Sequence, residues 1–316
     1  MRAEKVSIGA FQPGDLDGVL RLLNRTLNAD PMSSEVFQRK VVLDINFHPD
    51  GAPVARSGDE VVGFMLGLVR KYPLEDGAPD FDRGWITLMA VEPRLQRQRI
   101  GSRLLQHLLD YFQASNRTSV WVSPYAPNYF SPGIDEAAYP GAIEFLKKHG
   151  FQVAYRPLSM DALLLNLETP EWVKEKEARL IEDGMVFDTF KPEYILPLLD
   201  HLRREFPGDW QHYERESMVR ITQGTFPADQ LFVAMENGKC VGFCQHDGER
   251  FGPFGVDLAE RSRGIGAVLL FRCVHSMRSK DLHSAWFLWT NDHVAKLYAQ
   301  AGFKETRRYS LMKREL

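Results

Sequence analysis

Two stretches of the chain carry the same helical pattern of apolar residues. Within 100–112 and within 265–277 the apolar side chains recur at spacings that place them on one face of an α-helix. Each stretch follows a short apolar run and a turn that contains glycine, so we predict a strand, a turn and a helix at both places. The first stripe comprises Ile100, Leu104, Leu105, Leu108, Leu109 and Phe112, and the second comprises Ile265, Leu269, Leu270, Cys273, Val274 and Met277.

The similarity extends beyond these helices and indicates two copies of one unit. Near the start and again near the middle of the chain, an apolar run leads through the motif Phe-x-Pro into a helical pattern. The segment VARSGDEVVGF resembles VAMENGKCVGF, and both predict hairpins. The first copy has two extra segments rich in turn-forming residues, KYPLEDGAPDFDR and SPYAPNYFSPGIDEAAYP, which we expect to be inserted loops.

Each copy predicts the same order of elements: strand, helix, hairpin, strand, turn, helix, strand, helix and closing strand. This order is typical of a mixed α/β sheet. Between the copies, a charged segment that begins at Thr169-Pro170 and ends at Gly184 predicts a solvent-exposed helix. We therefore expect a first domain over 1–168, a linker helix over 169–184 and a second domain over 185–316.

Composition and charge fit a globular protein and exclude several classes. The 316 residues are 44% hydrophobic and 26% charged, and the net charge of -3 provides no overall positive field for nucleic acid or anionic membranes. The chain starts without an apolar signal segment and has no apolar run of transmembrane length, so we expect a cytoplasmic protein. Three cysteines are too few for a disulfide framework, and we expect Cys240 and Cys244 to be buried strand thiols.

The turn before the second of these helices has the features of an anion site. Its sequence, Arg261-Ser-Arg263-Gly264-Ile265-Gly266, follows an apolar strand and opens a helix. The first N–H groups of a helix lack partners within the helix and carry the positive end of its dipole. The glycines let a phosphate approach these groups, and the arginines add positive charge. An alternative interpretation is a basic, solvated turn at a helix start.

Other phosphate-binding motifs do not fit. A P-loop requires GxxxxGK[ST], and the chain contains neither Gly-Lys-Ser nor Gly-Lys-Thr. The dinucleotide motif GxGxxG fails because Gly264-x-Gly266 is followed by Ala267-Val-Leu. A nucleoside triphosphatase and a dehydrogenase are therefore disfavoured.

The pattern Arg261-x-x-Gly264-x-Gly266 after a strand, followed by WFLWTND and then AKLYAQAGF, resembles the GCN5-related N-acetyltransferase (GNAT) family. Both halves share the resemblance. It implies an α/β fold with two tandem GNAT-like domains, each a mixed, mostly antiparallel sheet of six to seven strands flanked by helices. It further implies that the sheet opens between its fourth and fifth strands to bind acetyl-CoA (coenzyme A) as acyl donor, with no metal.

The resemblance also implies roles for individual residues of the second half. The strand around Phe254 and Val256 would offer backbone groups to the pantetheine arm, which Asn291 would also contact. Tyr298 matches the family's tyrosine near the thioester sulfur. The turn would bind the pyrophosphate through Arg261, Arg263, Gly264, Ile265, Gly266 and Ala267, and the corresponding cofactor-binding positions of the first half are Val91, Gln96 and Gly101.

Acyl transfer from a thioester to an amine requires the amine to lose a proton. For a lysine-like amine of pKa near 10.4, becoming neutral at pH 7 costs about 4.6 kcal/mol, so a base should help. No residue is clearly marked as this base. His246, Asp247 and Glu249 occupy the preceding hairpin, and we take Glu249 as the candidate, although exposed hairpins commonly carry such residues. Tyr298 would donate a hydrogen bond to the developing thiolate; the alternative is a buried aromatic on an apolar stripe.

The first half departs from the family pattern twice. Arg99 replaces the first glycine of the turn, and Leu146 occupies the position of the tyrosine. Tyrosines of the inserted loop, namely Tyr125, Tyr129 and Tyr139, would supply a phenol from elsewhere or form a lid. The first half is either a degenerate domain with a supporting role or a second site with altered chemistry, and we favour the former.

We therefore expect an acyl-CoA-dependent N-acetyltransferase whose second domain binds acetyl-CoA and performs direct attack of an amine on the thioester. The acceptor would be a small-molecule or peptide amine, and the protein a monomer or homodimer. The alternative is a non-catalytic acyl-CoA-binding regulatory module. Nucleic-acid binding through the arginines near residue 97 is a weaker hypothesis because interleaved aromatic residues are absent.

Overall fold

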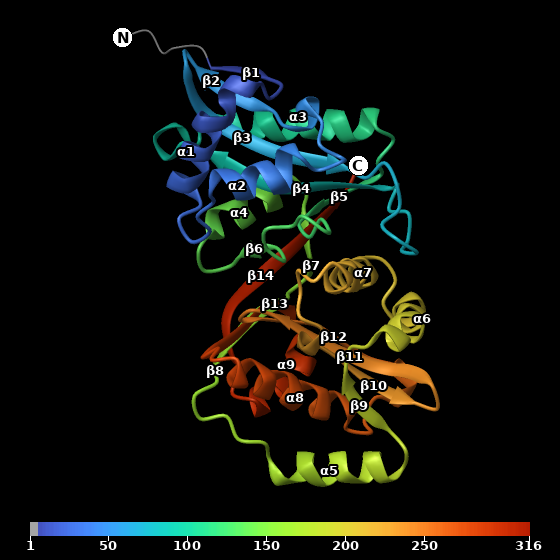
Figure 1. Ribbon diagram of the computed structural model, residues 1–316. Helices are drawn as coiled ribbons and strands as arrows, with labels where there is room; N and C mark the ends of the chain where they lie inside the picture. Colours follow the sequence, from blue (N-terminus) through green and yellow to red (C-terminus); the bar gives the residue numbers. More distant parts are fainter. Residues whose placement is uncertain (1–5) are drawn as a thin grey trace. The chain divides into compact units, whose positions relative to one another are not determined.

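The computed structural model describes residues 6–316 and divides into two compact units (Figure 1). Unit 1 contains the chain up to Tyr72, then Asp80–Arg156 and Tyr309–Leu316. Unit 2 contains Pro73–Pro79 and Pro157–Arg308. Each unit has its own sheet and its own apolar cores, so each is described separately.

Unit 1 contains a mixed sheet in which one neighbouring pair, β4 and β5, is parallel and the other pairs are antiparallel. The last strand, β14 (Lys304–Glu315), contributes its second half to this sheet, where it pairs with β5 and with β7. The other strands are β1 (Ser7–Gly9), β2 (Val54–Ser57), β3 (Glu60–Val69), β4 (Arg83–Val91), β5 (Ser119–Val122), β6 (Ile134–Asp135) and β7 (Gln152–Tyr155).

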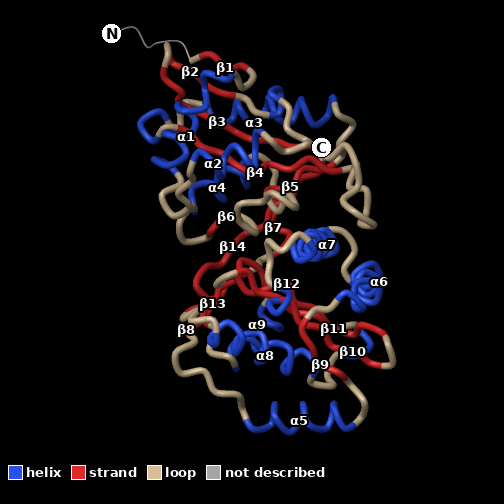
Figure 2. The backbone as a smooth tube through the Cα atoms, in the orientation of Figure 1, coloured by secondary structure: helices blue, strands red, loops and turns tan. Residues whose placement is uncertain are grey.

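Helices cover both faces of this sheet because its strands bury apolar side chains on both sides (Figure 2). Buried residues of α1 (Leu16–Thr26) and α2 (Ser34–Phe37) form one core with one side of β3. Buried residues of α3 (Ile100–Ala114) and α4 (Pro140–Lys148) form the other core. The predicted stripe of α3 is buried along its whole length.

Unit 2 repeats this architecture. Its strands follow the order β9-β10-β11-β12-β13-β8, and the first half of β14 pairs with β8 at the end. Only β12 and β13 run parallel within this order. The bounds are β8 (Leu158–Leu163), β9 (Val186–Thr189), β10 (Leu231–Glu236), β11 (Lys239–Asp247), β12 (Arg250–Val256) and β13 (Ser284–Thr290).

The helices of unit 2 also form two layers. Apolar residues of α6 (Ile195–Glu205) and α7 (Asp209–Thr222) pack on one face of β10 and β11. On the other face, α5 (Glu171–Glu182), α8 (Ile265–Ser279) and α9 (Asp292–Gln300) share a core with the alternate strand residues. The predicted tandem α/β fold, with mixed and mostly antiparallel sheets, is confirmed.

The limits of the two units differ from the domain limits expected from the sequence. The strand β8 lies before the expected boundary at residue 168 but pairs with β13 in unit 2. Residues 309–316 lie in the second repeat but pair with β5 in unit 1. Each repeat therefore gives its closing strand to the sheet of the other, and the helix α5, expected as a linker, is part of unit 2.

The first extra segment of the first repeat also belongs to unit 2. Within Pro73–Pro79, Glu75 lies 3.2 Å from His212 and 2.8 Å from Arg215 of α7. The neighbouring Asp76 accepts hydrogen bonds from Arg203 at 3.0 Å and from Gln211 at 2.5 Å. These contacts hold the segment against α6 and α7, so it is not a free loop.

Candidate functional site

The sheet of unit 2 opens between its fourth and fifth strands, as predicted. The parallel strands β12 and β13 are paired at one position, Arg250 with Trp286, and both strands continue beyond it. In unit 1 the corresponding strands β4 and β5 pair at four positions, from Arg83 with Ser119 to Ile86 with Val122. The opening in unit 2 therefore begins at Arg250 and extends toward the end of β12.

A turn connects the open end of β12 to α8. Ser262 and Gly264 adopt positive φ angles of 72° and 96°, and α8 begins at Ile265. Gly264 is the N-cap residue and no side chain caps the helix start, so the first N–H groups of α8 lack a side-chain acceptor. These groups and the helix dipole make the turn suitable for an anionic group.

The two arginines of the turn have different surroundings. Arg263 donates to both carboxylate oxygens of Glu236, at 3.0 and 2.8 Å, and also pairs with Glu260. These hydrogen bonds raise the pKa of the Arg263 guanidinium above its usual range. Arg261 is exposed and has no comparable partner among residues 6–316. Of the two predicted phosphate ligands, Arg261 is therefore the one whose charge is available.

Lys176 is a third cation at this turn, and the sequence did not point to it. It comes from α5, and a Cβ atom added at Gly264 would lie 2.4 Å from Lys176 Cγ. Its half-buried stem thus covers Gly264, whereas the charged run of α5 predicts a solvent-exposed face. Sequence spacing alone could not place this lysine, since it depends on how α5 packs on α8.

The remaining turn and strand positions contribute backbone rather than side chains. Ile265 and Ala267 are buried in the core. Gly266 lies against β12, where an added Cβ would be 3.2 Å from the ring of Phe254 and 3.6 Å from Val256. The missing side chain at Gly266 therefore lets β12 and α8 approach closely, with only the backbone amides of the helix start open to a ligand.

Asn291 caps the next helix. Its Oδ1 accepts hydrogen bonds from the backbone N–H groups of His293 and Val294, both at 3.0 Å, at the start of α9. This follows from the preference for asparagine at the N-cap position. Its amide nitrogen is not used in the cap, so it remains a candidate donor to a pantetheine group.

Tyr298 lies inside an aromatic cluster. Its side chain is 7% exposed, and its ring centre is 4.4 Å from that of Phe287 and 5.7 Å from those of Phe251 and Phe303. Burial raises the pKa of the Tyr298 phenol well above its usual range. The hydroxyl therefore stays protonated at neutral pH and can only act as a hydrogen-bond donor or acceptor.

The three candidate bases of the hairpin differ in their exposure and in their partners. Glu249 is exposed, and its backbone carbonyl accepts from Trp286. Asp247 is bound by Arg220 at 2.9 Å. His246 is fully buried on the α8 side of the sheet, 3.4 Å from the Ser276 hydroxyl, and burial lowers the pKa of its imidazole.

The corresponding turn of unit 1 has a similar backbone conformation, but different side chains pack against it. Arg99 adopts the left-handed conformation, with φ 64°, that Gly264 adopts in unit 2. The exposed Gln96 donates to the carbonyl of Val91 at 3.2 Å. The ring of Phe145 lies against Gly101, since an added Cβ there would be 3.4 Å from the ring.

The inserted loop of unit 1 is fixed to the rest of that unit. Tyr125 is buried and its hydroxyl donates to Asp44 at 3.0 Å, while the carbonyl of Tyr129 accepts from Lys40 at 2.8 Å. The Tyr139 hydroxyl donates to Asp30 at 2.8 Å. All three tyrosines of the loop therefore anchor it within unit 1.

Sequence reasoning missed a buried histidine and aspartate at the base of the turn. Asp257 follows β12 directly, and its Oδ1 lies 2.9 Å from Nδ1 of His201 on α6. Burial lowers the pKa of His201 to about 4 and raises the pKa of Asp257. The imidazole is therefore neutral near pH 7. The helical pattern of α6 places residue 201 on the apolar face of the helix, and this position was the signal in the sequence that His201 is buried.

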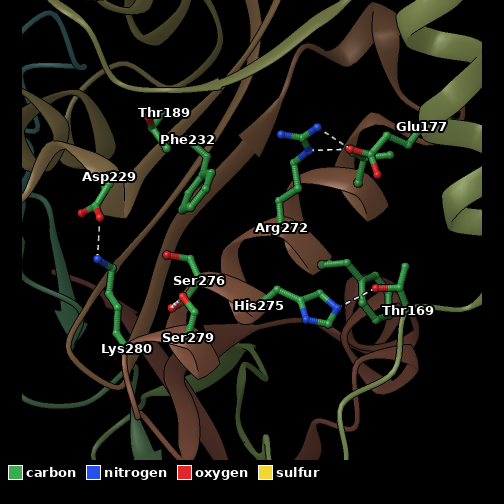
Figure 3. Close-up of a pocket in the computed structure, with 12 residues that line it drawn as sticks. Thr169, Glu177, Thr189, Asp229, Phe232, Arg272, His275, Ser276, Ser279 and Lys280 are labelled. Atoms are coloured by element: carbon green, nitrogen blue, oxygen red, sulfur yellow. Dashed lines mark hydrogen bonds and ion pairs between the residues drawn. The ribbon is translucent and has the colours of Figure 1, made fainter.

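A separate hollow of about 580 Å³ lies along α8, beyond its first turn. Figure 3 shows an ion pair of Lys280 with Asp229 at one end and an ion pair of Arg272 with Glu177 at the other. The ring of Phe232 lies between them. The charged groups that line this hollow are thus paired with one another, and it is not part of the predicted cofactor site.

The described residues contain neither a metal-binding cluster nor a membrane-spanning helix. In residues 6–316, no cluster of three or more histidine, cysteine or acidic side chains could hold a metal ion. Within the same range, none of the helices has the length and apolar character needed to cross a membrane. Cys240 and Cys244 are buried thiols of β11, as expected, and Cys273 is buried on α8.

Comparison with known proteins identifies the family. The model of the acetyltransferase (GNAT) family matches residues 19–151 and 195–303. No match was found among curated proteins. Similar solved structures include a GCN5-related N-acetyltransferase from Sphaerobacter thermophilus, at 19% identity and a TM-score of 0.72, with 98% of this chain and 95% of that chain covered.

Two further structures are similar over nearly all of the chain. A tandem GNAT protein from the clavulanic acid biosynthesis pathway has 17% identity and a TM-score of 0.61, with 98% of both chains covered. A glucosamine N-acetyltransferase region of a fungal multi-domain β-N-acetylglucosaminidase has 19% identity and a TM-score of 0.78. That match covers 98% of this chain but 38% of the fungal chain. Because the family model matches more than half of the sequence, in two separate regions, the chain belongs to the acetyltransferase (GNAT) family as a tandem member.

Proposed function

We propose that the protein transfers an acetyl or other short acyl group from acyl-CoA to an amine, and that unit 2 carries the active site. The observation that supports this most is the uncapped start of α8 at the open end of the β12–β13 pair. Helix-start N–H groups without a side-chain acceptor are suited to binding phosphate groups. The family membership supports the acyl-transfer chemistry in general terms.

Within this site we assign the binding roles to the backbone and to two cations. The N–H groups of residues 265–267 would bind the pyrophosphate, with Arg261 and Lys176 supplying charge. Arg263 would instead hold the turn in shape through its pairs with Glu236 and Glu260. Asn291 would fix the start of α9 and donate its free amide N–H groups to the pantetheine arm.

For the chemical step, Tyr298 would donate a hydrogen bond to the sulfur as it departs. Its raised pKa favours donation over full proton transfer, since the phenol would be a weaker acid than in water. Glu249 is the candidate base expected from the sequence, and its side chain is exposed at the end of the hairpin.

We further propose that unit 1 is degenerate and supports the fold. It lacks the tyrosine, because Leu146 is fully buried at that position, and Arg99 occupies a conformation that glycine adopts more easily. Its closing strand comes from residues 309–316, so the two repeats depend on each other to complete their sheets.

The acceptor class is an amine, and the panel for testing it should be broad. One similar structure is described as a glucosamine N-acetyltransferase region, so amino sugars belong in the panel beside lysine-containing and amino-terminal peptides. The identity to that protein is low and supports the fold only.

Calorimetry with acetyl-CoA, followed by a thiol-release assay over the amine panel, tests the proposal. Saturable binding and release of free thiol with at least one amine are expected. Tight binding without transfer to any amine would favour a regulatory acyl-CoA-binding module. Failure to bind at millimolar concentrations would contradict both functions.

A further inference from the structure

Helix α7 buries a polar face. An amphipathic helix normally turns apolar side chains toward its sheet, but three of the four buried residues of α7 are polar, namely Gln211, Glu214 and Ser217 beside Met218. Gln211 is satisfied by Asp76, to which it donates at 2.5 Å. Both carboxyl oxygens of Glu214 are buried without a hydrogen-bond partner among residues 6–316. An unpartnered buried carboxyl group is costly, so this residue calls for a functional explanation.

Glu214 belongs to a helix that packs on β12, one of the two strands that border the opening in the sheet. Helix α7 contacts β12, and the guanidinium of Arg250 lies over the ring of Tyr213, 4.8 Å from its centre. Arg250 also acts electrostatically on Glu214. Arg250 is also the β12 residue that pairs with β13, so the charge that acts on Glu214 lies at the point where the two strands separate.

A second unpartnered acceptor lies on the same face of the sheet. Gln245 is buried, and its Oε1 has no hydrogen-bond partner within the described chain. Its neighbours Cys244 and His246 face α8, where they meet Cys273 and Ser276. Since side chains alternate along a strand, Gln245 faces the side covered by α6 and α7. Glu214 and Gln245 thus contribute three unpartnered acceptor oxygens on this face, which suit a ligand rich in N–H donors.

We propose that Glu214, rather than the exposed Glu249, is the general base of the reaction and that Gln245 Oε1 helps to receive the N–H groups of a primary amine. This inference rests on the proposed function. The ammonium gives one proton to the Glu214 carboxylate, and the freed lone pair forms a bond to the thioester carbon. The C–S bond then breaks with its electron pair on sulfur, and a second proton from the nitrogen converts the thiolate to the thiol. Glu214 later returns its proton to solvent.

The surroundings of Glu214 tune it for this role. Burial raises the pKa of its carboxyl group well above the usual range, and Arg250 on β12 acts in the opposite direction. On β11 the thiols of Cys240 and Cys244 are neutral, because burial raises the pKa of both. On α6 the buried His201 is neutral, and on α7 Arg215 is paired with Glu75. Glu214 therefore ionises at a higher pH than an exposed carboxyl, and the rate should rise with pH as it does so.

The variant Glu214→Gln tests this role with little change in shape, because the amide is neutral like the protonated carboxyl. We expect turnover to fall by about 100-fold or more and the rising limb of the pH profile to be lost. Acetyl-CoA affinity and melting temperature should not change. The matched control is Glu216→Gln, on the exposed side of the same helix, which should keep both turnover and the pH profile.

An acceptor amine whose own pKa lies below neutrality arrives without the extra proton. It should therefore restore much of the turnover of Glu214→Gln, which a purely structural role would not predict. Unchanged turnover and an unchanged pH profile in Glu214→Gln would overturn the inference while leaving the proposed function intact. Should the variant fail to fold, the wild-type protein can be tested with weakly basic amines. A transfer rate to those amines that is independent of pH near neutrality would support the inference. A strong dependence with those amines would overturn it. A wild-type protein that acylates no amine would contradict the inference and the proposed function together.

Discussion

The stem of Lys176 lies directly over Gly264, so that a Cβ atom at Gly264 would come within 2.4 Å of Lys176 Cγ. The relationship joins two features of one turn. Gly264 has a φ of 96°, which L-residues rarely adopt, and it ends the loop that presents the first N–H groups of α8. Lys176 adds a positive charge from a different helix. The turn is thus shaped by backbone conformation, packing and charge together.

Replacing Gly264 with alanine should damage both stability and acetyl-CoA affinity. The left-handed conformation alone costs about 1–2 kcal/mol for a residue with a Cβ, and the contact with Lys176 must also be relieved. Denaturant unfolding and calorimetry measure the two effects. Gly184→Ala is the matched control, since Gly184 has a φ of 93° with open space around it, and it should lose stability without losing affinity. Equal affinity in Gly264→Ala and wild type would contradict the assignment of the turn.

Arg261→Ala and Arg263→Ala should have different effects. Removing the exposed Arg261 should weaken acetyl-CoA binding by about tenfold, which corresponds to the loss of one contact to a charged group. It should also reduce the dependence of affinity on salt. Arg263→Ala should mainly lower stability, because Arg263 is paired with Glu236 and Glu260. The free energy of unfolding should fall by at most about 1 kcal/mol, with a lower melting temperature. Binding by calorimetry at two salt concentrations separates them. The reverse pattern would show that Arg263 is the phosphate ligand.

Tyr298→Phe should lower turnover by about tenfold or more without weakening acetyl-CoA binding. The ring keeps its contacts with Phe287 and Phe251, so the melting temperature should not fall. The loss reflects one hydrogen bond to the departing sulfur. Steady-state kinetics and calorimetry check this, with Tyr194→Phe as a control at a hydroxyl bound to Asp188 in the same unit. Unchanged turnover would remove Tyr298 from the mechanism and leave it a core residue.

The buried His201 should make the protein less stable in mild acid. In the folded state the pKa of His201 is about 4, below its usual value near 6.5. The contribution of the neutral imidazole to the free energy of unfolding is therefore complete above pH 6.5. That contribution, about 3 kcal/mol at most, is lost as the pH falls from 6.5 toward 4. The raised pKa of Asp257 acts in the opposite direction, so a comparison of variants is needed. The melting temperature of His201→Phe should fall less between pH 7 and pH 4.5 than that of the wild type. Parallel curves would contradict the prediction.

The sequence predicted the repeated fold well because periodicity and turn chemistry are local. The stripes of α3 and α8 and the glycine turns before them depend on residues close together in the chain. The exchange of closing strands could not be predicted. Both sheets need an antiparallel strand at the same place, and nothing in the sequence of β8 or β14 distinguishes one sheet from the other.

The site was predicted less completely because it depends on contacts between distant residues. Whether Arg261 or Arg263 is available depends on Glu236, which lies on a separate hairpin. The position of Lys176 depends on the packing of α5 against α8. Glu214 occurs in a run of charged residues that normally face water, so its burial is visible only once α7 is placed on β12.

The central claim is that the first N–H groups of α8 bind the pyrophosphate of acyl-CoA, and Gly266 and Gly101 allow a direct test. They are the second residues of α8 and α3, so a protein labelled with ¹⁵N-glycine reports on both turns in one spectrum. On titration with acetyl-CoA, we expect the Gly266 amide resonance to shift in a saturable way and that of Gly101 to stay in place. An unchanged Gly266 resonance at millimolar acetyl-CoA would contradict the account, whether or not Gly101 responds.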